Sequence, residues 1–281
     1  MSYSTLSLTV EDQVAQLELG RPEQLNSLTL PLFQELLSAC QELERKPEVR
    51  ALIISSTGKH FTAGLDLMAL GALAGDLMTG ERSRSAYTLR TCVKELQLSI
   101  NAVEELRIPV LVAIHGGCIG GGVDLATACD LRYCTQDAFF CVQETNVGLV
   151  ADIGTMQRLP KLIPEGVARE LCFTGRRLPA ERALALGLVN AVYPDQATML
   201  SEVRKTALEI ASKSPLVISG IKHVLNYGRD HGVRDGLDYV AAWQAGMLSA
   251  QDLMEQAAAK GTGRVPQYGA LPPPRDLVRS K

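Results

Sequence analysis

The first third of the chain has alternations of apolar and polar residues that predict strands and one helix. From Thr5 to Leu19 apolar and polar residues alternate on both sides of Glu11-Asp12, which is typical of a hairpin of two strands. From Leu30 to Arg45 leucines recur at helical spacing, and Lys46-Pro47 ends that pattern. The apolar run from Val49 to Ser55 then predicts a buried strand.

The middle of the chain predicts a long helical stretch, followed by strands around a glycine-rich turn. Residues from about Leu67 to Leu106 have mostly helical character, with an interruption near Gly71–Gly80 that is a candidate for a mobile or a substrate-adapted segment. Ile108–Ile114 predicts a second buried strand, which runs into a glycine turn and a helix from Gly121 to Cys129. Two further short strands are expected, at Leu131–Cys134 and Ala138–Val142.

Helices dominate the remainder of the chain. The expected helices are Thr155–Leu162, Pro164–Phe173, Pro179–Leu186, Ala197–Ser212, Pro215–Tyr227 and Val233–Ala259, with a strand at Leu188–Pro194. Strands that alternate with helices predict an α/β fold with a parallel sheet. We expect a core at residues 1–195 and a C-terminal helical region with an irregular tail at residues 196–281. The Ala-, Met- and Leu-rich stretch around Trp243 fits either the core or a contact with another subunit.

Composition and charge exclude several classes of protein. The 281 residues are 46% hydrophobic and 21% charged, which is ordinary for a soluble globular chain. A net charge of −3 without a basic cluster argues against a nucleic-acid partner. No segment is apolar and long enough to span a bilayer, so no membrane span is expected.

The cysteines and the chain ends bear on the cellular compartment. The seven cysteines lack CxxC spacing and form no ligand pattern with the four histidines, so we expect reduced thiols and no metal site. Abundant free thiols favour a reducing compartment. The N-terminal residues lack the features of a signal or transit peptide, and the terminal RSK differs from the peroxisomal SKL signal. A cytoplasmic location is the simplest prediction.

The stretch from Gly116 to Asp152 combines features that suit proton transfer. It joins a triple-glycine turn and a helix start with three spaced carboxylates, Asp124, Glu144 and Asp152. Glycines let backbone approach a ligand closely, and a helix N-terminus offers free N–H groups and positive potential. Acids beside such an anion site suit a reaction that forms an enolate while it moves a proton.

Each of these features also has a purely structural interpretation. Asp124 could be an acid favoured in the first turn of a helix, Glu144 a solvated loop charge, and Asp152 the N-cap of the helix that begins at Thr155. The combination favours function, because Glu144 and Asp152 lie in a run of apolar and small residues where a buried carboxylate is costly.

Three segments together resemble the crotonase, or enoyl-CoA hydratase/isomerase, superfamily. They are FTAGLDL at 61–67, HGGCIGGGVDLATACDLRY at 115–133, and the run from Glu144 through GTMQRLP at 154–160. RPEQLNSL, FTGRRLPAERALALGLVNAVYP and SPLVISGIKHVL extend the likeness to about Ala259. The resemblance implies a crotonase-like spiral of ββα units with a C-terminal helical trimerisation region. It also implies an acyl-CoA thioester substrate and a homotrimer or a dimer of trimers.

The resemblance also assigns binding residues. The family's oxyanion hole falls on the backbone N–H groups of Leu65 and Gly121, which would face a thioester oxygen that becomes negative. The acyl-CoA groove would be lined by the same two residues and their neighbours, Ala63, Gly64, Asp66 and Leu67.

The pattern of acids separates the branches of the superfamily. Family hydratases carry Glu at the positions of both Asp124 and Glu144, and glycine at the position of Asp152. The three acids of this chain, with GLVADIGTMQRLPK, resemble the Δ3,5-Δ2,4-dienoyl-CoA isomerase branch instead. Asn146 departs from that branch, whose members often carry Asp there, and this should alter the local electrostatics.

This resemblance implies an isomerase that converts 3,5-dienoyl-CoA to 2,4-dienoyl-CoA in unsaturated fatty acid degradation. Glu144 would be the base at C2, Asp152 the acid at C6, and Asp124 a group that tunes or orients the pair. Their environments should separate the pKa values of the two acids. No metal or redox cofactor is required. The alternatives are a hydratase or another crotonase-type acyl-CoA enzyme, with Asp124 and Glu144 around one water, and a non-catalytic scaffold or binding protein.

Overall fold

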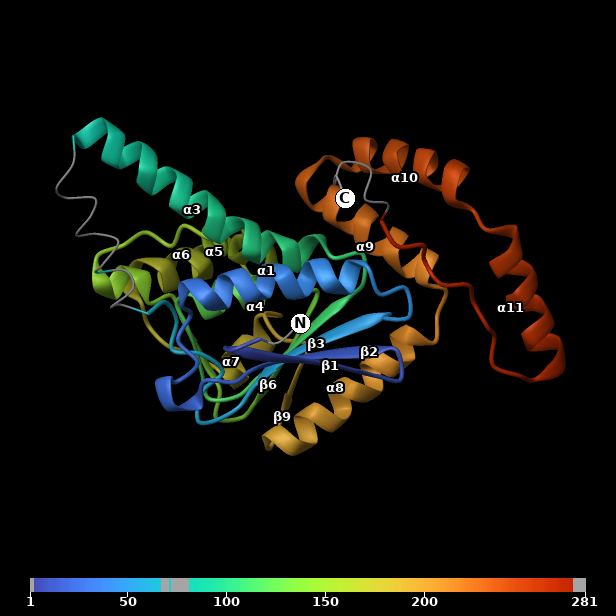
Figure 1. Ribbon diagram of the computed structural model, residues 1–281, viewed down its shortest axis with the longest axis horizontal. Coiled ribbons are helices and arrows are strands. Elements are labelled where there is room, and N and C mark those ends of the chain that lie inside the picture. Colours follow the sequence, from blue (N-terminus) through green and yellow to red (C-terminus); the bar gives the residue numbers. More distant parts are fainter. Residues whose placement is uncertain (1–2, 67–70, 72–80, 275–281) are drawn as a thin grey trace.

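A six-stranded sheet forms the centre of the protein (Figure 1). The computed structural model describes residues 3–66, 71 and 81–274. The strands, in spatial order, are β1 (Leu6–Glu11), β2 (Val14–Leu19), β3 (Ala51–Ser56), β4 (Val110–Ile114), β6 (Leu131–Thr135) and β9 (Ala191–Tyr193). β1 and β2 are antiparallel, and every later pair is parallel. The predicted α/β fold with a parallel sheet is confirmed.

The opening hairpin forms as its alternation predicts. Asp12 and Gln13 have positive φ values of 50° and 67°, which turns the chain back so that Leu6 pairs with Leu19. Such two-residue turns match the twist of the flanking strands. β3 is buried along its whole length, in agreement with its continuous apolar run.

Helices cover both faces of the sheet because neighbouring strand residues point to opposite sides. On one face Leu52 and Ile54 join a large apolar cluster with α1 (Leu30–Glu44) and the C-terminal end of α3 (Arg82–Glu105). On the other face Ile53 packs with Met199 and Val203 of α8 (Gln196–Ala211).

A second, three-stranded sheet was only partly foreseen. β5 (Gly117–Ile119) pairs in parallel with β7 (Phe139–Cys141), which pairs with the short β8 (Leu178–Pro179). The sequence predicts only the middle strand, because β5 lies inside the glycine-rich stretch and β8 has two residues. Around this sheet lie α4 (Gly121–Ala128), the 3₁₀ turn η2 (Glu144–Val147), α5 (Thr155–Leu162), α6 (Glu165–Thr174) and α7 (Ala180–Ala185).

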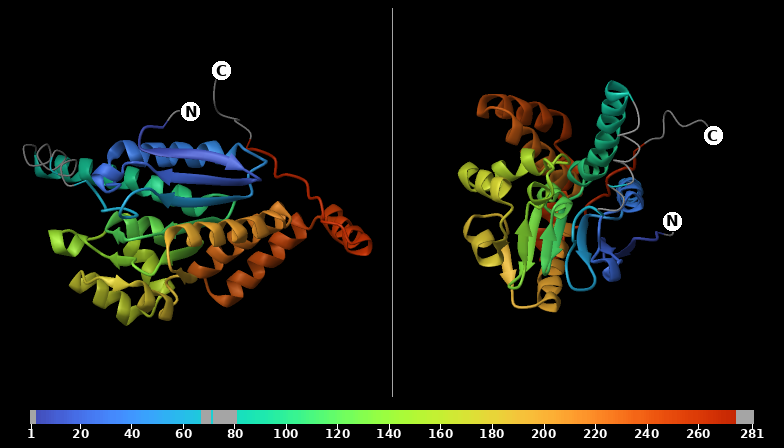
Figure 2. Two further views of the ribbon diagram at one scale, coloured as in Figure 1. Left: turned by 90° about the horizontal axis from the view of Figure 1, so that it is seen from below. Right: turned by 90° about the vertical axis from the view of Figure 1, so that its left-hand side faces the viewer.

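The C-terminal helices are α9 (Pro215–Asp230), α10 (Val233–Met247) and α11 (Ala250–Thr262). The single helix expected over Val233–Ala259 is therefore wrong. Leu248 is extended, and the Ser249 side chain accepts a hydrogen bond from the backbone N–H of Asp252, which starts a new helix. These helices lie on the side away from the N-terminal end of α3 (Figure 2). Most of the interruption expected near Gly71–Gly80 lies outside the described residues.

Candidate active site

The structure contains a cavity of about 430 Å³ between α3, the turn from β5 into α4, and the segment that follows β7. We call it the acid-lined cavity, because Glu144 and Asp152 both contribute to its wall. Its other polar side chains are Gln143 and Arg177. The rest of the lining is glycine, cysteine or apolar, namely Ala63, Gly64, Leu65, Leu89, Cys92, Val93, Leu96, Ile119, Gly120, Gly121, Val147, Leu149, Val150 and Ile153.

Two glycines let the loop after β3 approach the β5–α4 turn closely. Gly64 has φ +87°, and a Cβ atom there would lie 2.7 Å from the carbonyl oxygen of Ile119. Gly120 has φ +52°, and a Cβ atom there would lie 3.1 Å from Oε1 of Glu144. A side chain at Gly64 would force two backbones apart, and one at Gly120 would displace the carboxyl group of Glu144. The contact therefore requires the glycines that the motifs contain.

The N–H groups of Leu65 and Gly121 meet at this contact. The flanking groups are occupied, since Leu28 N–H donates to the Gly64 carbonyl (2.8 Å) and Asp66 N–H donates to the Leu28 carbonyl (3.0 Å). Within the described residues, neither Leu65 N–H nor Gly121 N–H has a hydrogen-bond acceptor. Gly121 is the first residue of α4, so the positive end of the helix lies at the same place. Both residues line the acid-lined cavity, as an oxyanion hole requires.

Glu144 is held by its own turn and projects into the acid-lined cavity. Its backbone carbonyl accepts from Leu149 N–H at 2.9 Å, which closes the turn. The Oε2 atom is buried and has no hydrogen-bond partner among the described residues. Burial, with the neighbouring charges of Asp124 and Asp152, raises the pKa of Glu144 to about 7. Such a carboxyl group is close to half ionised at neutral pH, which suits a group that takes and gives protons.

Asp152 lies on the same cavity but is reached by solvent. Burial raises the pKa of its carboxyl group. The interpretation of Asp152 as an N-cap is wrong, because the N-cap of α5 is Gly154, which has no side chain to cap with. The side chain of Asp152 is therefore available for chemistry in the cavity.

Asp124 lies behind the wall of the cavity and is not part of its lining. Its side chain is fully buried, and Oδ1 accepts a hydrogen bond of 2.5 Å from Thr155 N–H at the start of α5. Asp124 thus caps the helix that Gly154 leaves uncapped. Burial is the main cause that raises its pKa to about 6, against the effect of the Thr155 N–H group. At neutral pH Asp124 is mostly an anion beside Glu144.

Asp66 and Asn146, which the sequence also singles out, do not line the acid-lined cavity. The carboxylate of Asp66 accepts from the Ser27 hydroxyl at 3.3 Å. Leu67 lies outside the described residues. Asn146 is turned away from the cavity lining, and its side-chain amide donates to Gln143 Oε1 (3.0 Å) and to the Gly175 carbonyl (3.1 Å). An Asp at this position could not donate these two bonds.

The apolar wall of the cavity was missed at the sequence level. Leu89, Cys92, Val93 and Leu96 of α3 face it at the i, i+3, i+4, i+7 spacing of one helix face. Val147, Leu149 and Val150 face it from the segment after η2. The spacing on α3 was a usable signal, but it does not by itself distinguish a cavity wall from a packed core.

The chain is similar in sequence to known proteins over most of its length. The chain matches the Enoyl-CoA hydratase/isomerase family over residues 9–256. The chain belongs to this family. It is 42% identical over 274 residues to a peroxisomal Delta(3,5)-Delta(2,4)-dienoyl-CoA isomerase of Arabidopsis thaliana, covering 96% of this chain and 99% of that protein. It is 43% identical over 260 residues to the mitochondrial protein of that name from Homo sapiens, covering 92% of this chain and 79% of that one.

Solved structures of the enoyl-CoA hydratase/isomerase family share the fold. The crystal structure of an enoyl-CoA hydratase from Bacillus anthracis has a TM-score of 0.85 and 30% identity, covering 94% of this chain and 99% of that chain. A putative enoyl-CoA hydratase from Streptomyces coelicolor gives a TM-score of 0.85 at 28% identity, covering 95% of each chain. In the described part of this chain, no helix combines the length and apolar character needed to cross a membrane.

Proposed function

We propose that the protein is a Δ3,5-Δ2,4-dienoyl-CoA isomerase that acts in the breakdown of unsaturated fatty acids. One observation carries this proposal: Glu144 and Asp152 line the same largely apolar cavity as Leu65 and Gly121, whose N–H groups have no acceptor among the described residues. The names of the relatives from Arabidopsis and human support the same substrate. The thioester head lies at the N–H groups, and the conjugated acyl tail lies between the two acids and the wall of α3.

The reaction is a pair of proton transfers. Glu144 takes a proton from C2 of the 3,5-dienoyl chain, and the electrons of the broken C–H bond spread over the diene to the thioester oxygen. The N–H groups of Leu65 and Gly121 stabilise that oxygen as it becomes negative. Asp152 then gives its proton to C6, which leaves double bonds at C2 and C4. No oxidation or reduction occurs, so the residues suffice without a metal or redox cofactor.

The acyl tail itself prepares Asp152 as the acid. The side chain of Asp152 is exposed to solvent. An apolar tail displaces this water, and loss of hydration disfavours the charged carboxylate, so its already raised pKa rises further. The substrate thereby favours the protonated form that must deliver a proton to C6.

The position of Asp124 argues against the hydratase alternative. Water addition needs two acids around one water, and the hydratase branch uses the positions of Asp124 and Glu144 for that pair. Here Asp124 is outside the cavity lining, and its Oδ1 atom is engaged by Thr155 N–H. Asp124 is better placed to hold α5 and to raise the pKa of Glu144 by its charge.

The proposal is tested by incubation of the purified protein with 3,5-dienoyl-CoA of several chain lengths. We expect a rise in ultraviolet absorbance as the 2,4-dienoyl-CoA forms in conjugation with the thioester. Robust hydration of crotonyl-CoA, undiminished by the loss of Asp152, would support the hydratase alternative. Tight acyl-CoA binding without turnover of any dienoyl, enoyl or hydroxyacyl thioester would support a non-catalytic role.

The raised pKa of Glu144 predicts the pH dependence. Because the base must be ionised, the rate at which deuterium from D₂O enters C2 of 3,5-dienoyl-CoA should rise with pH through about 7, the pKa of Glu144. In an Asp124→Asn variant a like charge is removed, so the pKa of Glu144 falls and the acid limb of the profile shifts to lower pH. Asn retains the carbonyl oxygen that accepts from Thr155 N–H. A pH profile whose acid limb is the same in both proteins would contradict this coupling.

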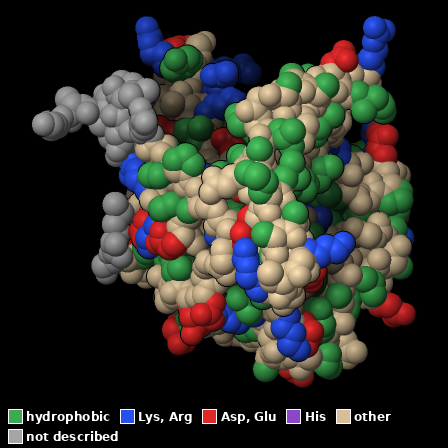
Figure 3. Space-filling view, turned by 90° about the vertical axis from the view of Figure 1, so that its right-hand side faces the viewer, with side chains coloured by type: hydrophobic (Ala, Val, Ile, Leu, Met, Phe, Trp, Pro, Cys, Tyr) green, Lys and Arg blue, Asp and Glu red, His purple; other side chains and the backbone are tan. Residues whose placement is uncertain are grey.

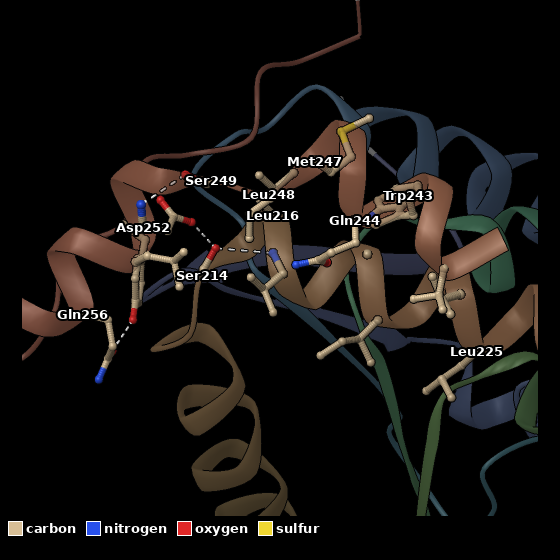
Figure 4. Close-up of a pocket in the computed structure, with 17 residues that line it drawn as sticks. Ser214, Leu216, Leu225, Trp243, Gln244, Met247, Leu248, Ser249, Asp252 and Gln256 are labelled. Atoms are coloured by element: carbon tan, nitrogen blue, oxygen red, sulfur yellow. Dashed lines mark hydrogen bonds between the residues drawn. The ribbon is translucent and has the colours of Figure 1, made fainter. Parts of the chain in front are cut away.

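We also propose that the C-terminal helices join copies of the chain into a homotrimer or a dimer of trimers, on a core built as a crotonase-like spiral. Hydrophobic side chains gather on the face that these helices form (Figure 3). No residue of α10 is buried, and the exposed fractions of Leu225, Val233 and Leu253 are 67%, 82% and 59%. Between α9, α10 and α11 lies an apolar groove of about 480 Å³ beside Trp243, Met247 and Leu248 (Figure 4). Apolar surface of this kind marks subunit contacts.

The assembly is tested by light scattering after gel filtration. The wild-type protein should have at least three times the chain mass of 30.3 kDa. Leu253→Asp places a charge in the groove and should lower that mass. Gln251→Asp, on the same helix but outside the groove lining, is the matched control and should leave the mass unchanged. A wild-type mass of one chain contradicts the proposal.

The cytoplasmic location remains a prediction from the sequence. The relatives from Arabidopsis and human carry peroxisomal and mitochondrial in their names. Fractionation of the native host, with detection of the protein by antibody, decides between a cytoplasmic and an organellar site.

A further inference from the structure

A stripe of polar side chains on α3 lies against the back of the segment that carries Asp152. Gln97, Asn101 and Glu104 are spaced i, i+4 and i+7, so they share one face of the helix. They follow directly after the part of α3 that lines the acid-lined cavity, which ends at Leu96. The same helix therefore forms the wall of the cavity and then contacts the segment from 152 to 158.

The three side chains hold this segment at both ends. Gln97 Nε2 donates a hydrogen bond of 2.6 Å to the backbone carbonyl of Asp152. Six residues later, Arg158 Nη2 donates to Asn101 Oδ1 and to Glu104 Oε2, each at 2.7 Å. Arg158 is only 8% exposed, so its buried positive charge requires the hydrogen bonds and the negative charge that these partners supply. The segment is thus fixed to α3 before and after its turn.

The turn has little internal structure of its own. Residues 151–154 belong to no helix or strand, and Gly154 has φ +144°. A Cβ atom at Gly154 would lie 1.9 Å from Arg158 Nη1, so the guanidinium group packs directly on the backbone of the turn. The Thr155 N–H bond to Asp124 and the buried side chains of Ala151 and Ile153 add further anchors. The place of Asp152 therefore depends on side chains from elsewhere in the chain.

Glu144 is anchored differently. Its turn closes through its own backbone, and the neighbouring Thr145 hydroxyl donates to the Cys172 carbonyl of α6 at 2.6 Å. Among the described residues, no hydrogen bond or ion pair links this turn to Gln97. The two acids of the cavity are consequently held by independent sets of bonds.

We propose that Gln97 is a positioning residue for Asp152, supported by the Asn101–Arg158–Glu104 cluster, and that it serves proton delivery at C6 separately from proton removal at C2. This inference rests on the proposed isomerase function. Proton transfer requires the acid within hydrogen-bond reach of the carbon, so a small drift of Asp152 slows the second step. Loss of Gln97 should leave the first step intact, because Glu144 keeps all of its own bonds.

The test compares Gln97→Leu with Gln157→Leu. Leu has about the volume of Gln but no donor. Gln157 is an exposed glutamine of α5 that lines the same surface hollow as Gln97 and forms no side-chain hydrogen bond with the described residues. With 3,5-dienoyl-CoA in D₂O, deuterium entering C2 of recovered substrate reports the first step, and 2,4-dienoyl-CoA reports both. For Gln97→Leu we expect kcat for isomerisation to fall about tenfold with KM unchanged. The ratio of C2 exchange to isomerisation should rise by the same factor.

The outcomes separate the positioning role from the function it rests on. An unchanged ratio in an active Gln97→Leu protein, or an equal fall of exchange and isomerisation, overturns the positioning role. Amide hydrogen exchange gives a readout that does not depend on substrate: residues 150–158 should exchange faster in Gln97→Leu and not in Gln157→Leu. Unchanged amide exchange also overturns the role. A wild-type protein that neither exchanges C2 nor isomerises refutes the proposed function instead, and amide exchange still decides whether Gln97 fixes the segment.

Discussion

Replacement of Asp152 by Asn should lower the isomerisation rate by a factor of about 10² to 10⁴, the usual contribution of a positioned acid or base. Asn has the shape of Asp but cannot give a proton to C6. Deuterium exchange at C2 of 3,5-dienoyl-CoA should persist, because Glu144 and the N–H groups of Leu65 and Gly121 remain in place and loss of the Asp152 charge favours the ionised form of Glu144. Glu144→Gln should lose both exchange and isomerisation. Absorbance and mass spectrometry of the recovered thioester measure the two steps.

The control for this substitution is Asp12→Asn. Asp12 lies in the turn of the opening hairpin and is not part of the lining of the acid-lined cavity, and Asn tolerates its positive φ. This variant should keep full activity. If Asp152→Asn lost exchange while Glu144→Gln kept it, the roles of the two acids would be reversed. If both variants kept full isomerisation, the two-acid mechanism would be excluded.

Gly64→Ala should lower kcat by a factor of about 10² to 10³, the loss expected when one oxyanion donor is displaced. The new Cβ atom would lie 2.7 Å from the Ile119 carbonyl oxygen, which is backbone and cannot move aside. The loop must then shift, and the Leu65 N–H group shifts with it. The C2 exchange should fall together with isomerisation, because the oxyanion hole stabilises the enolate that both require.

Gly187→Ala separates this effect from simple backbone strain. Gly187 has φ +80°, close to the +87° of Gly64, but a Cβ atom there meets no atom within 4 Å. Both variants should lose about 1 kcal/mol of unfolding free energy from the left-handed conformation, measured by denaturant unfolding. Gly64→Ala should also lose catalytic activity, whereas Gly187→Ala should keep it. Equal activity in the two variants would show that the close approach at Gly64 is not needed for catalysis.

The sequence determined the periodic elements and the chemistry of the site. The alternation before and after Glu11-Asp12 gave the hairpin, and the apolar run at Val49–Ser55 corresponds to β3 with a shift of one or two residues. The carboxylates at 144 and 152 were recognisable because ionised groups rarely occur in apolar runs without a function or partner. Both line the acid-lined cavity with Leu65 and Gly121.

Only the tertiary structure decided how distant segments meet. Asp124 caps a helix that starts 31 residues later, and Gln97 binds the backbone of a residue 55 positions away. The break at Leu248-Ser249 likewise divides a stretch whose residues predict one continuous helix. Sequence patterns report local conformation and which side chains avoid water, because these follow from neighbouring residues. Contacts between remote groups depend on packing of the whole chain, and these contacts decided which acids share a cavity and which element holds each one.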